Sequence, residues 1–169
     1  MSHHIEQVNR HKKFLRIALE EARIGYKEGG IPIGSVIVHN DRVIGRGHNR
    51  RIQLGNPILH AEMDALQNAG RLTASVYTKC TLYTTLSPCQ MCTGAIMLYR
   101  IPHVVIGENR NFQGAEDLLR SEGIILDIID DTDCYDLLQR FIAKNENIWH
   151  EDIGEEKPSS LFTPTIKGG

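Results

Sequence analysis

Two short motifs in the sequence carry side chains that could hold a metal ion. His60-Ala61-Glu62 contains an imidazole and a carboxylate, and Pro88-Cys89-Gln90-Met91-Cys92 contains two thiols. Two cysteines three residues apart on a helix project from the same face, and a helix N-terminus lowers the pKa of a thiol there. Because zinc readily accepts two thiolates and one imidazole, we predict a zinc site formed by His60, Cys89 and Cys92.

The number of available ligands predicts a catalytic zinc site rather than a structural one. Neither Cys80 nor Cys134 has the local spacing of a fourth ligand, and catalytic zinc sites keep three protein ligands and one position for water. Zinc lowers the pKa of such a water to about 7. Glu62 would not bind the metal and could carry protons between the water, a ring nitrogen and a departing amine. The predicted reaction is the hydrolytic deamination of an amino-substituted heterocycle.

Each motif alone has a simpler interpretation. A lone His60 is more often a core or surface histidine, and Glu62 alone would be a solvated helix residue. The pair Cys89 and Cys92 could be a redox dithiol, but Pro88 precedes the cysteines instead of standing between them. Half of a zinc ribbon would need a second cysteine pair, which the sequence lacks. The complete pattern, H-x-E followed by P-C-x-x-C, is the signature of zinc-dependent nucleobase deaminases.

The predicted elements would bring the two motifs together. Hydrophobic periodicity and turn residues predict helices over 9–26, 60–70, 88–99, 114–121 and 134–144, and strands over 33–38, 43–48, 81–86, 104–107 and 124–129. After an opening hairpin the strands alternate with helices, which predicts an α/β sandwich with a largely parallel sheet. The helices that begin at His60 and Cys89 would start from neighbouring strands and meet at the carboxyl edge of the sheet, where open α/β sheets bind ligands.

Length and charge restrict the class of protein further. The 169 residues fit one domain, and we expect residues 1–169 to form a single deaminase domain whose ends, 1–10 and 156–169, are flexible. The net charge of −2 lacks the basic excess of a nucleic-acid binder, so no nucleic-acid partner is expected. The sequence has no apolar run long enough for a membrane span and no recognisable export signal, so we expect a cytoplasmic protein with reduced thiols.

The sequence resembles the cytidine deaminase-like superfamily and, within it, the fungal-type cytosine deaminases. The resemblance covers residues 14–155 and is carried by the zinc motifs and by residues 25–34, 45–49, 82–89, 92–96, 107–109, 111–112 and 149–155. The zinc motifs specify the superfamily, whereas 107–109, 111–112 and 149–155 indicate the subgroup. This resemblance implies a three-layer α/β/α sandwich with a five-stranded mixed sheet, and a homodimer that packs helices of the deaminase core across a two-fold axis.

The resemblance also implies roles for individual residues. His60, Cys89 and Cys92 would bind one zinc ion per subunit, and Glu62 would shuttle protons as the catalytic residue. Six residues would surround the substrate, a free base: Ile33, Asn49, Ser87 through its backbone, Phe112, Trp149 and Asp152. The Asn49 amide offers a donor and an acceptor to the polar edge of a pyrimidine. Phe112 and Trp149 would wall and cap the pocket, and Asp152 would lie near the leaving amine.

The function that these observations predict is the zinc-dependent deamination of cytosine to uracil and ammonia, in pyrimidine salvage. Ile58 stands where the fungal enzymes have a threonine next to the pocket, which leaves a deaminase of guanine, of a pterin or of a cyclic amidine such as creatinine as an alternative. A tRNA adenosine deaminase is a second alternative, although it should have a basic face. A zinc scaffold without turnover is the third, and it would have no need of Glu62.

Overall fold

The computed structural model describes residues 2–155. These residues contain a five-stranded sheet with the order β2-β1-β3-β4-β5. Its strands are β1 (Gly34–His39), β2 (Arg42–His48), β3 (Cys80–Leu86), β4 (His103–Glu108) and β5 (Ile125–Ile128). Strand β1 is antiparallel to β2 and β3, whereas β3, β4 and β5 pair in parallel. Four strands therefore run in one direction with β1 reversed among them, which confirms the expected mixed sheet.

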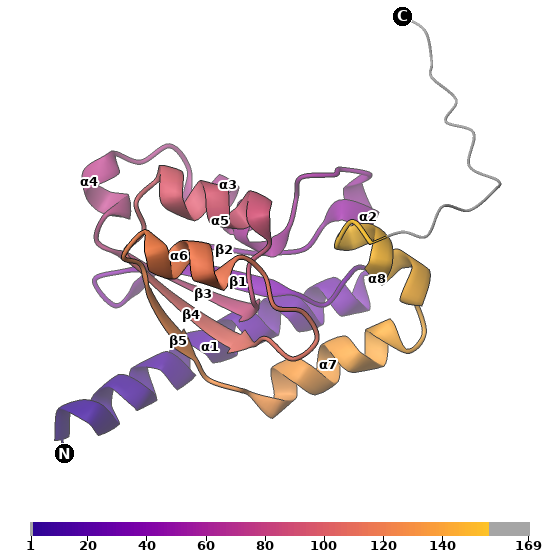
Figure 1. Cartoon of the computed structure of the whole chain (residues 1–169), viewed down its shortest axis with the longest axis horizontal. Helices are drawn as coiled ribbons and strands as arrows, with labels where there is room; N and C mark the ends of the chain where they lie inside the picture. The colour runs from indigo at the N-terminus through magenta and orange to yellow at the C-terminus, as the bar shows by residue number, and fades with distance from the viewer. Residues whose placement is uncertain (1, 156–169) are drawn as a thin grey trace, which may run out of the picture.

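Helices cover both faces of the sheet and make the expected three layers (Figure 1). Helices α1 (Ser2–Lys27) and α7 (Thr132–Ile142) lie on one face, and α3 (Ala61–Ala69), α5 (Gln90–Leu98) and α6 (Glu116–Ser121) lie on the other. Three short helices complete the described chain: α2 (Arg51–Leu54), α4 (Ala74–Tyr77) and α8 (Glu146–Asp152). None of the helices in residues 2–155 is long and apolar enough to cross a membrane.

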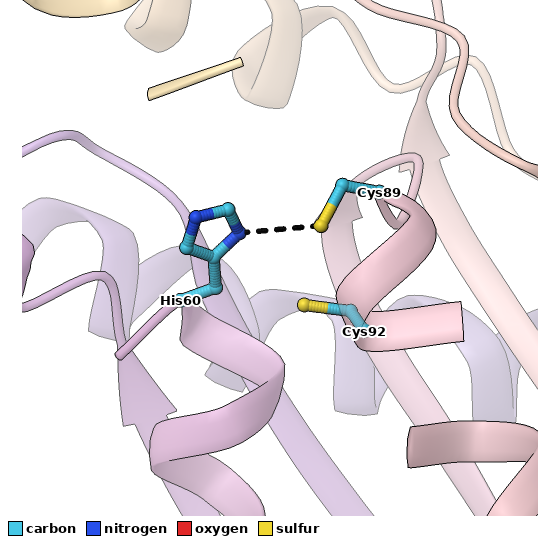
Figure 2. A group of neighbouring side chains, drawn as sticks. All are labelled: His60, Cys89 and Cys92. Carbon is cyan, nitrogen blue, oxygen red and sulfur yellow. Dashed lines mark hydrogen bonds between the residues drawn. The ribbon is translucent and has the colours of Figure 1, made fainter. Parts of the chain in front are cut away.

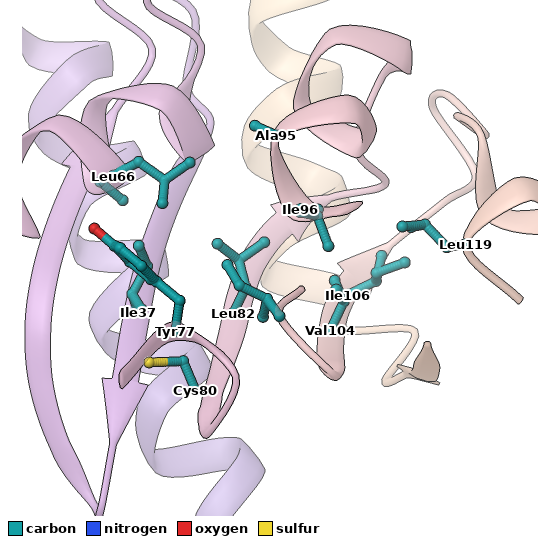
Figure 3. Packing of buried hydrophobic residues seen from close by; sticks show 12 residues of the cluster. Ile37, Leu66, Tyr77, Cys80, Leu82, Ala95, Ile96, Val104, Ile106 and Leu119 are labelled. Carbon is teal, nitrogen blue, oxygen red and sulfur yellow. The ribbon is translucent and has the colours of Figure 1, made fainter. Parts of the chain in front are cut away.

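Strand alternation divides the apolar core between the two faces. Successive side chains on a strand point to opposite sides, so Val36 and Val38 pack toward α1 while Ile37, between them, packs toward α3. The same alternation separates Tyr83 from Leu82, and Figure 3 shows Leu82 between the sheet and the helices that carry Leu66 and Ile96. All five strand residues are fully buried or nearly so, so packing on both faces holds the sheet in place.

Two local features set the position of the helix that follows β2. The hairpin between β1 and β2 turns through Asn40 and Asp41, whose φ angles of 47° and 58° fit a two-residue turn that matches the strand twist. Gly47 in β2 lets α3 approach closely, because a Cβ there would lie 2.7 Å from Ala65 N. The close packing of α3 on β2 therefore depends on a missing side chain.

The predicted start of the first helix and the predicted set of helices need correction. Helix α1 begins at Ser2 rather than Asn9, so residues 2–10 are helical instead of frayed. Adding polar residues to an existing helix costs little once packing of its later turns has nucleated it, and Arg10 also donates a hydrogen bond to Asp41 at 2.6 Å. Helices α2, α4 and α8 were not predicted. The expectation for 156–169 lies outside the described residues.

Candidate metal centre and active site

The three predicted zinc ligands come from the starts of two helices on the same face of the sheet. His60 immediately precedes α3 and Cys89 immediately precedes α5, both with extended backbone (φ −65°, ψ 164° and φ −69°, ψ 176°). Cys92 lies in the first turn of α5. Figure 2 shows the imidazole and the two sulfurs facing one another across the gap between the helices. The sequence prediction of two converging helix starts is therefore confirmed.

The strands that lead to these helices differ from the prediction in one respect. His60 follows β2 and Cys89 follows β3, and these strands are not neighbours because β1 lies between them. Since β1 is antiparallel to both, β2 and β3 run in the same direction and end at the same edge. The site consequently lies over the start of β1, where Ile33 leads into the strand.

The ligand atoms are close enough to share one ion. Nδ1 of His60 lies 3.5 Å from Sγ of Cys89, and the ligand atoms of His60, Cys89 and Cys92 all lie within 4.8 Å of one another. Within residues 2–155 no further side chain joins this particular group. Two sulfurs and one imidazole nitrogen suit zinc, and a set of three protein ligands is that of a catalytic rather than a structural site.

The two thiols are electrostatically coupled. The pKa of Cys89 is lowered to about 4, because hydrogen bonds from the Cys92 thiol and the His60 ring stabilise its thiolate. The pKa of Cys92 is raised, first through its hydrogen bond to Cys89 and then through burial. Each sulfur thus shifts the pKa of the other in the opposite direction, and a divalent cation between the sulfurs would favour the loss of both protons. By contrast, burial raises the pKa of Cys80 to about 11.

Glu62 lies beside this group without belonging to it. Its side chain is only 4% exposed; Oε2 is 3.3 Å from Cys92 Sγ and Oε1 is 3.0 Å from the Thr84 hydroxyl. Burial raises its pKa, and the negative charge of Cys89 adds to the effect. A buried carboxyl group with a raised pKa next to a metal site is suited to accept a proton and then donate it.

A small cavity adjoins the metal ligands and Glu62. Four of the six predicted substrate residues line it: Ile33, Ser87, Phe112 and Asp152. Leu86 and Ile153 also line it, and neither is predicted from the sequence. The cavity measures about 20 Å³, roughly the room that one water needs. The structure therefore brings these side chains together, while their roles toward a substrate remain predictions.

The other two predicted substrate residues lie behind the cavity wall. Asn49 is fully buried, and its amide nitrogen donates to Asp152 Oδ1 at 3.1 Å while its Oδ1 accepts from the Arg51 backbone N–H. Trp149 is 4% exposed and packs edge-on against Phe112, with ring centroids 6.4 Å apart. Both therefore contact residues that line the cavity.

Arg51 is a contact residue that sequence reasoning misses. Its guanidinium donates to Asp152 Oδ1 at 2.8 Å and to Glu151 Oε1 at 2.6 Å, which connects α2 to α8 next to the cavity. The two segments are about 100 residues apart in the chain. A basic residue near Asn49 and an acidic pair near Trp149 are the available signals, but their pairing depends on the tertiary structure.

The side chain of Ser87, another residue that lines the cavity, holds the loop before helix α6 in place. Its hydroxyl donates to Glu116 Oε1 at 2.8 Å and accepts from the Gly114 N–H at 2.9 Å. Its backbone N–H bonds to the carbonyl of Glu108 at the end of β4. Because the hydroxyl is committed to the loop, the side chain positions this wall, and the contact of the Ser87 backbone with the substrate stays a prediction.

The fold and the site together define a class of protein. The structure has a mixed sheet between two helical layers, a His-Cys-Cys metal group at two helix starts and a neighbouring carboxylate outside the ligand group. These are the features of zinc-dependent nucleobase deaminases. Comparison with known proteins is more specific: the chain belongs to the family described as the cytidine and deoxycytidylate deaminase zinc-binding region, which matches residues 8–108.

Two relatives illustrate the similarity within this family. The chain is 54% identical over 145 residues to a cytosine deaminase of Candida albicans, covering 85% of this chain and 97% of the relative. It is 45% identical over 107 residues to a tRNA-specific adenosine deaminase of Streptococcus pyogenes, covering 62% of this chain and 67% of the relative.

Solved structures give the same fold. RibD of Acinetobacter baumannii superposes with a TM-score of 0.65 at 26% identity, covering 81% of this chain and 40% of that protein. A guanine deaminase of Bacillus subtilis superposes with a TM-score of 0.52 at 27% identity, covering 93% and 87% of the two chains. These similarities confirm the predicted fold class.

Proposed function

We propose that this chain hydrolyses cytosine to uracil and ammonia at the His60–Cys89–Cys92 centre. The observation that carries the proposal is the 54% identity to the Candida albicans cytosine deaminase, which extends over 97% of that enzyme. A match of this extent includes most of the residues around the cavity as well as the zinc motifs. The site geometry supports it independently, because a buried carboxyl group lies 3.3 Å from a metal-ligand sulfur.

Zinc, when held by His60, Cys89 and Cys92, would activate a water molecule for attack on a ring carbon. Glu62 accepts one proton of that water and delivers it to ring nitrogen N3. The same carboxyl group then passes the second proton to the exocyclic nitrogen, so that ammonia leaves as the carbonyl of uracil forms. Thr84, 3.0 Å from Glu62 Oε1, keeps the carboxyl group oriented toward the metal ligands during both transfers.

The cap over the cavity, formed by Asp152 and Ile153, favours a free base over a nucleoside. Asp152 at the end of α8 and the following Ile153 line the cavity, and Arg51 holds Asp152 in place at 2.8 Å. With about 20 Å³ of space, a pyrimidine enters only when a part of the cap moves. A ribose would require a permanent opening at this wall. The cap therefore supports cytosine rather than cytidine as the substrate.

The extent of the two matches and the net charge argue against a tRNA substrate. The adenosine deaminase match covers only 62% of this chain, whereas the cytosine deaminase match covers 85%. The net charge of −2 supplies no basic excess for an RNA backbone, and Glu151 beside the cap adds negative charge. Guanine, a pterin or a cyclic amidine stay as alternatives for the substrate screen below.

We also propose that two copies of the chain form a homodimer through the α3 and α5 side. Large apolar side chains are exposed there: Leu98 is 73% exposed, Ile58 is 53% exposed and Tyr99 is 41% exposed. Ile58 and Tyr99 line a surface depression of about 410 Å³ that is separate from the metal ligands. An apolar surface of this kind is typical of protein interfaces. Leu98→Glu should give a monomer in analytical ultracentrifugation, whereas Ile125→Glu, at a residue 61% exposed on edge strand β5, should leave the dimer intact.

The cellular setting completes the proposal. All four cysteines are free, and a thiolate metal site is most stable in a reducing compartment, which supports a cytoplasmic location. Conversion of cytosine to uracil, with release of ammonia, would serve pyrimidine salvage. Fluorescence microscopy of a tagged chain tests the location, and growth of a pyrimidine-requiring strain on cytosine tests salvage.

The decisive experiment is a screen for ammonia release by the purified protein. Cytosine, cytidine, guanine, adenine, a pterin and creatinine should be supplied separately, with the product identified by absorbance or mass. We expect turnover of cytosine to uracil and at least a hundredfold lower kcat/KM for cytidine. A preference for cytidine would contradict the role of the cap, and turnover of only another ring would contradict cytosine as the substrate.

A further inference from the structure

A second group of metal-ligating side chains lies far from the active site. His11 belongs to α1, His103 is the first residue of β4, and Asp127 lies within β5. Their ligand atoms all lie within 4.8 Å of one another. The active site is at the opposite end of the parallel strands, and its helices α3 and α5 cover the other face of the sheet (Figure 1). The group therefore has no part in the deamination proposed above.

The register of the sheet explains why these residues meet. Val105 pairs with Tyr83 on one side and with Asp127 on the other, and His103 lies two residues before Val105, so its side chain has the same orientation. Tyr83 and Val105 belong to the core beneath α1. His103 and Asp127 therefore point toward α1, where His11 meets them.

The three side chains converge on one carboxylate oxygen. His103 Nε2 lies 2.7 Å from Asp127 Oδ2, and His11 Nε2 lies 3.4 Å from the same atom. The two imidazole rings meet edge to face, with centroids 5.4 Å apart. The His11 side chain is 5% exposed and that of His103 is 16% exposed, while the carboxylate of Asp127 is 37% exposed. The group is thus enclosed by protein on the histidine side and reachable from solvent at Asp127.

The other nitrogen of His11 is held by a buried partner. Nδ1 lies 3.1 Å from the hydroxyl of Tyr83, a fully buried residue. When the ring carries its hydrogen on Nδ1 and donates it to the Tyr83 oxygen, the lone pair of Nε2 faces Asp127 and His103. The side-chain nitrogen of Gln7 also lies 3.4 Å from Nε2, and a cation bound by Nε2 would displace it. Such a contact on the outer nitrogen is what orients metal-binding histidines in known sites. It distinguishes this group from a chance surface cluster.

We propose that His11, His103 and Asp127 form a second divalent-cation site, which binds a transition-metal ion through two imidazole nitrogens and one carboxylate oxygen. This ligand type favours Zn²⁺, Co²⁺ and related ions over Mg²⁺ or Ca²⁺. The cation replaces the hydrogen between His103 and Asp127, and a small movement of the exposed Asp127 carboxylate provides the usual metal–ligand distances of about 2.0–2.2 Å. Bound there, the ion ties α1 to strands β4 and β5.

A cobalt titration of the zinc-loaded protein tests the proposal. Isothermal titration calorimetry should detect one additional equivalent of Co²⁺ in the wild type. His103→Ala and Asp127→Asn should weaken this binding at least tenfold, and Asp127→Asn keeps the shape of the side chain. His39→Ala removes another half-buried histidine of the same sheet and should bind as the wild type does. The double variant His3→Ala/His4→Ala removes the histidine pair early in the sequence and should also bind normally.

Two further measurements separate the outcomes. Co²⁺ at this site has no sulfur ligand, so its spectrum should lack the thiolate charge-transfer band that exchange into the Cys89–Cys92 centre would produce. In wild-type protein with ¹⁵N-labelled histidine, Co²⁺ should selectively broaden the ring signals of His11 and His103, a readout that requires no variant to fold. Absence of an additional equivalent, equal binding by His103→Ala, or a thiolate band for that equivalent would overturn the proposal.

Discussion

Asp152 Oδ1 lies 3.6 Å from Nε2 of His60, on the ring nitrogen opposite the one that faces Cys89. This separation is too long for a hydrogen bond, so the carboxylate acts on the ring through its charge. Arg51 and Asn49 hold that same oxygen at 2.8 and 3.1 Å. Oδ1 of Asp152 thus links the cap of the cavity to the metal ligand His60. A substitution at Asp152 should therefore affect both the cap and the metal centre.

Replacing Asp152 by Asn should lower zinc affinity or kcat/KM by about 10–100-fold, because partners of a metal-bound histidine tune its orientation and basicity. Enzyme kinetics and zinc competition with a chromophoric chelator measure the two effects. Glu151→Gln is the matched control, since Glu151 also pairs with Arg51 but its side chain is 44% exposed, where an ion pair contributes about 0–1 kcal/mol. Equal losses in both variants would contradict the link between Asp152 and His60.

Replacing Glu62 by Gln should reduce kcat by about 10²–10⁴-fold or more, because general acid–base transfer by a positioned group contributes that much. The variant should retain its zinc, measured by elemental analysis, since Glu62 is outside the ligand group. Asp117→Asn, at a side chain 98% exposed, should have wild-type activity. A Glu62→Gln protein that still deaminates at the wild-type rate would refute the assignment of proton transfer to this residue.

Removal of zinc should abolish activity reversibly. Dialysis against metal-free buffer should remove an ion held only by the thiolate-free group His11, His103 and Asp127 and leave about one zinc per chain, at the Cys89–Cys92 centre. A strong chelator should then inactivate the protein until zinc is returned. Cys89→Ser and Cys92→Ser should lose the metal, because serine is a poor zinc ligand. Cys80→Ala is the cysteine control: burial raises the pKa of Cys80 to about 11, so it stays a thiol, and the variant should keep both zinc and activity.

The pH dependence of stability should show the contribution of His48 and Glu21. Their side chains are hydrogen-bonded at 2.8 Å, an interaction that raises the pKa of His48 and lowers the pKa of Glu21. Stabilisation from the raised pKa of His48 is complete below its unfolded value of about 6.5 and is lost as pH rises through the folded value. Stabilisation from the lowered pKa of Glu21 is present above about 4.5 and is lost as pH falls through the folded value.

The pair should therefore stabilise the protein most between about pH 4.5 and 6.5. Three other residues also bond to this pair: Glu28 to the His48 ring, Arg46 to Glu21, and Asp64 to the His48 backbone N–H. The contribution of the His48–Glu21 contact therefore has to be measured against a variant. The free energy of unfolding in urea should be measured against pH for the wild type and for His48→Gln. The difference should shrink above the folded pKa of His48, and a constant difference across this range would disprove the assignment.

Much of the chemistry of this protein follows from residue type and spacing. These two properties identify His60, Glu62, Cys89 and Cys92, because a short spacing on a helix fixes the relative direction of side chains. The alternation of strands and helices likewise predicts the layers. Helix α8 is not predicted because its sequence has weak periodicity. Trp149, the residue that anchors it, packs against Phe112, a contact with a distant part of the chain that local periodicity does not reveal.

Local sequence determined the donors of the metal centre, the proton-carrying acid and the helix starts that present them, since each depends on residues only a few positions apart. The tertiary structure alone decided that β1 separates the two strands leading to the centre, that Arg51 meets Asp152 about 100 residues later, and that His11 meets His103 and Asp127. Those contacts depend on strand order and register, which follow from the packing of the whole core.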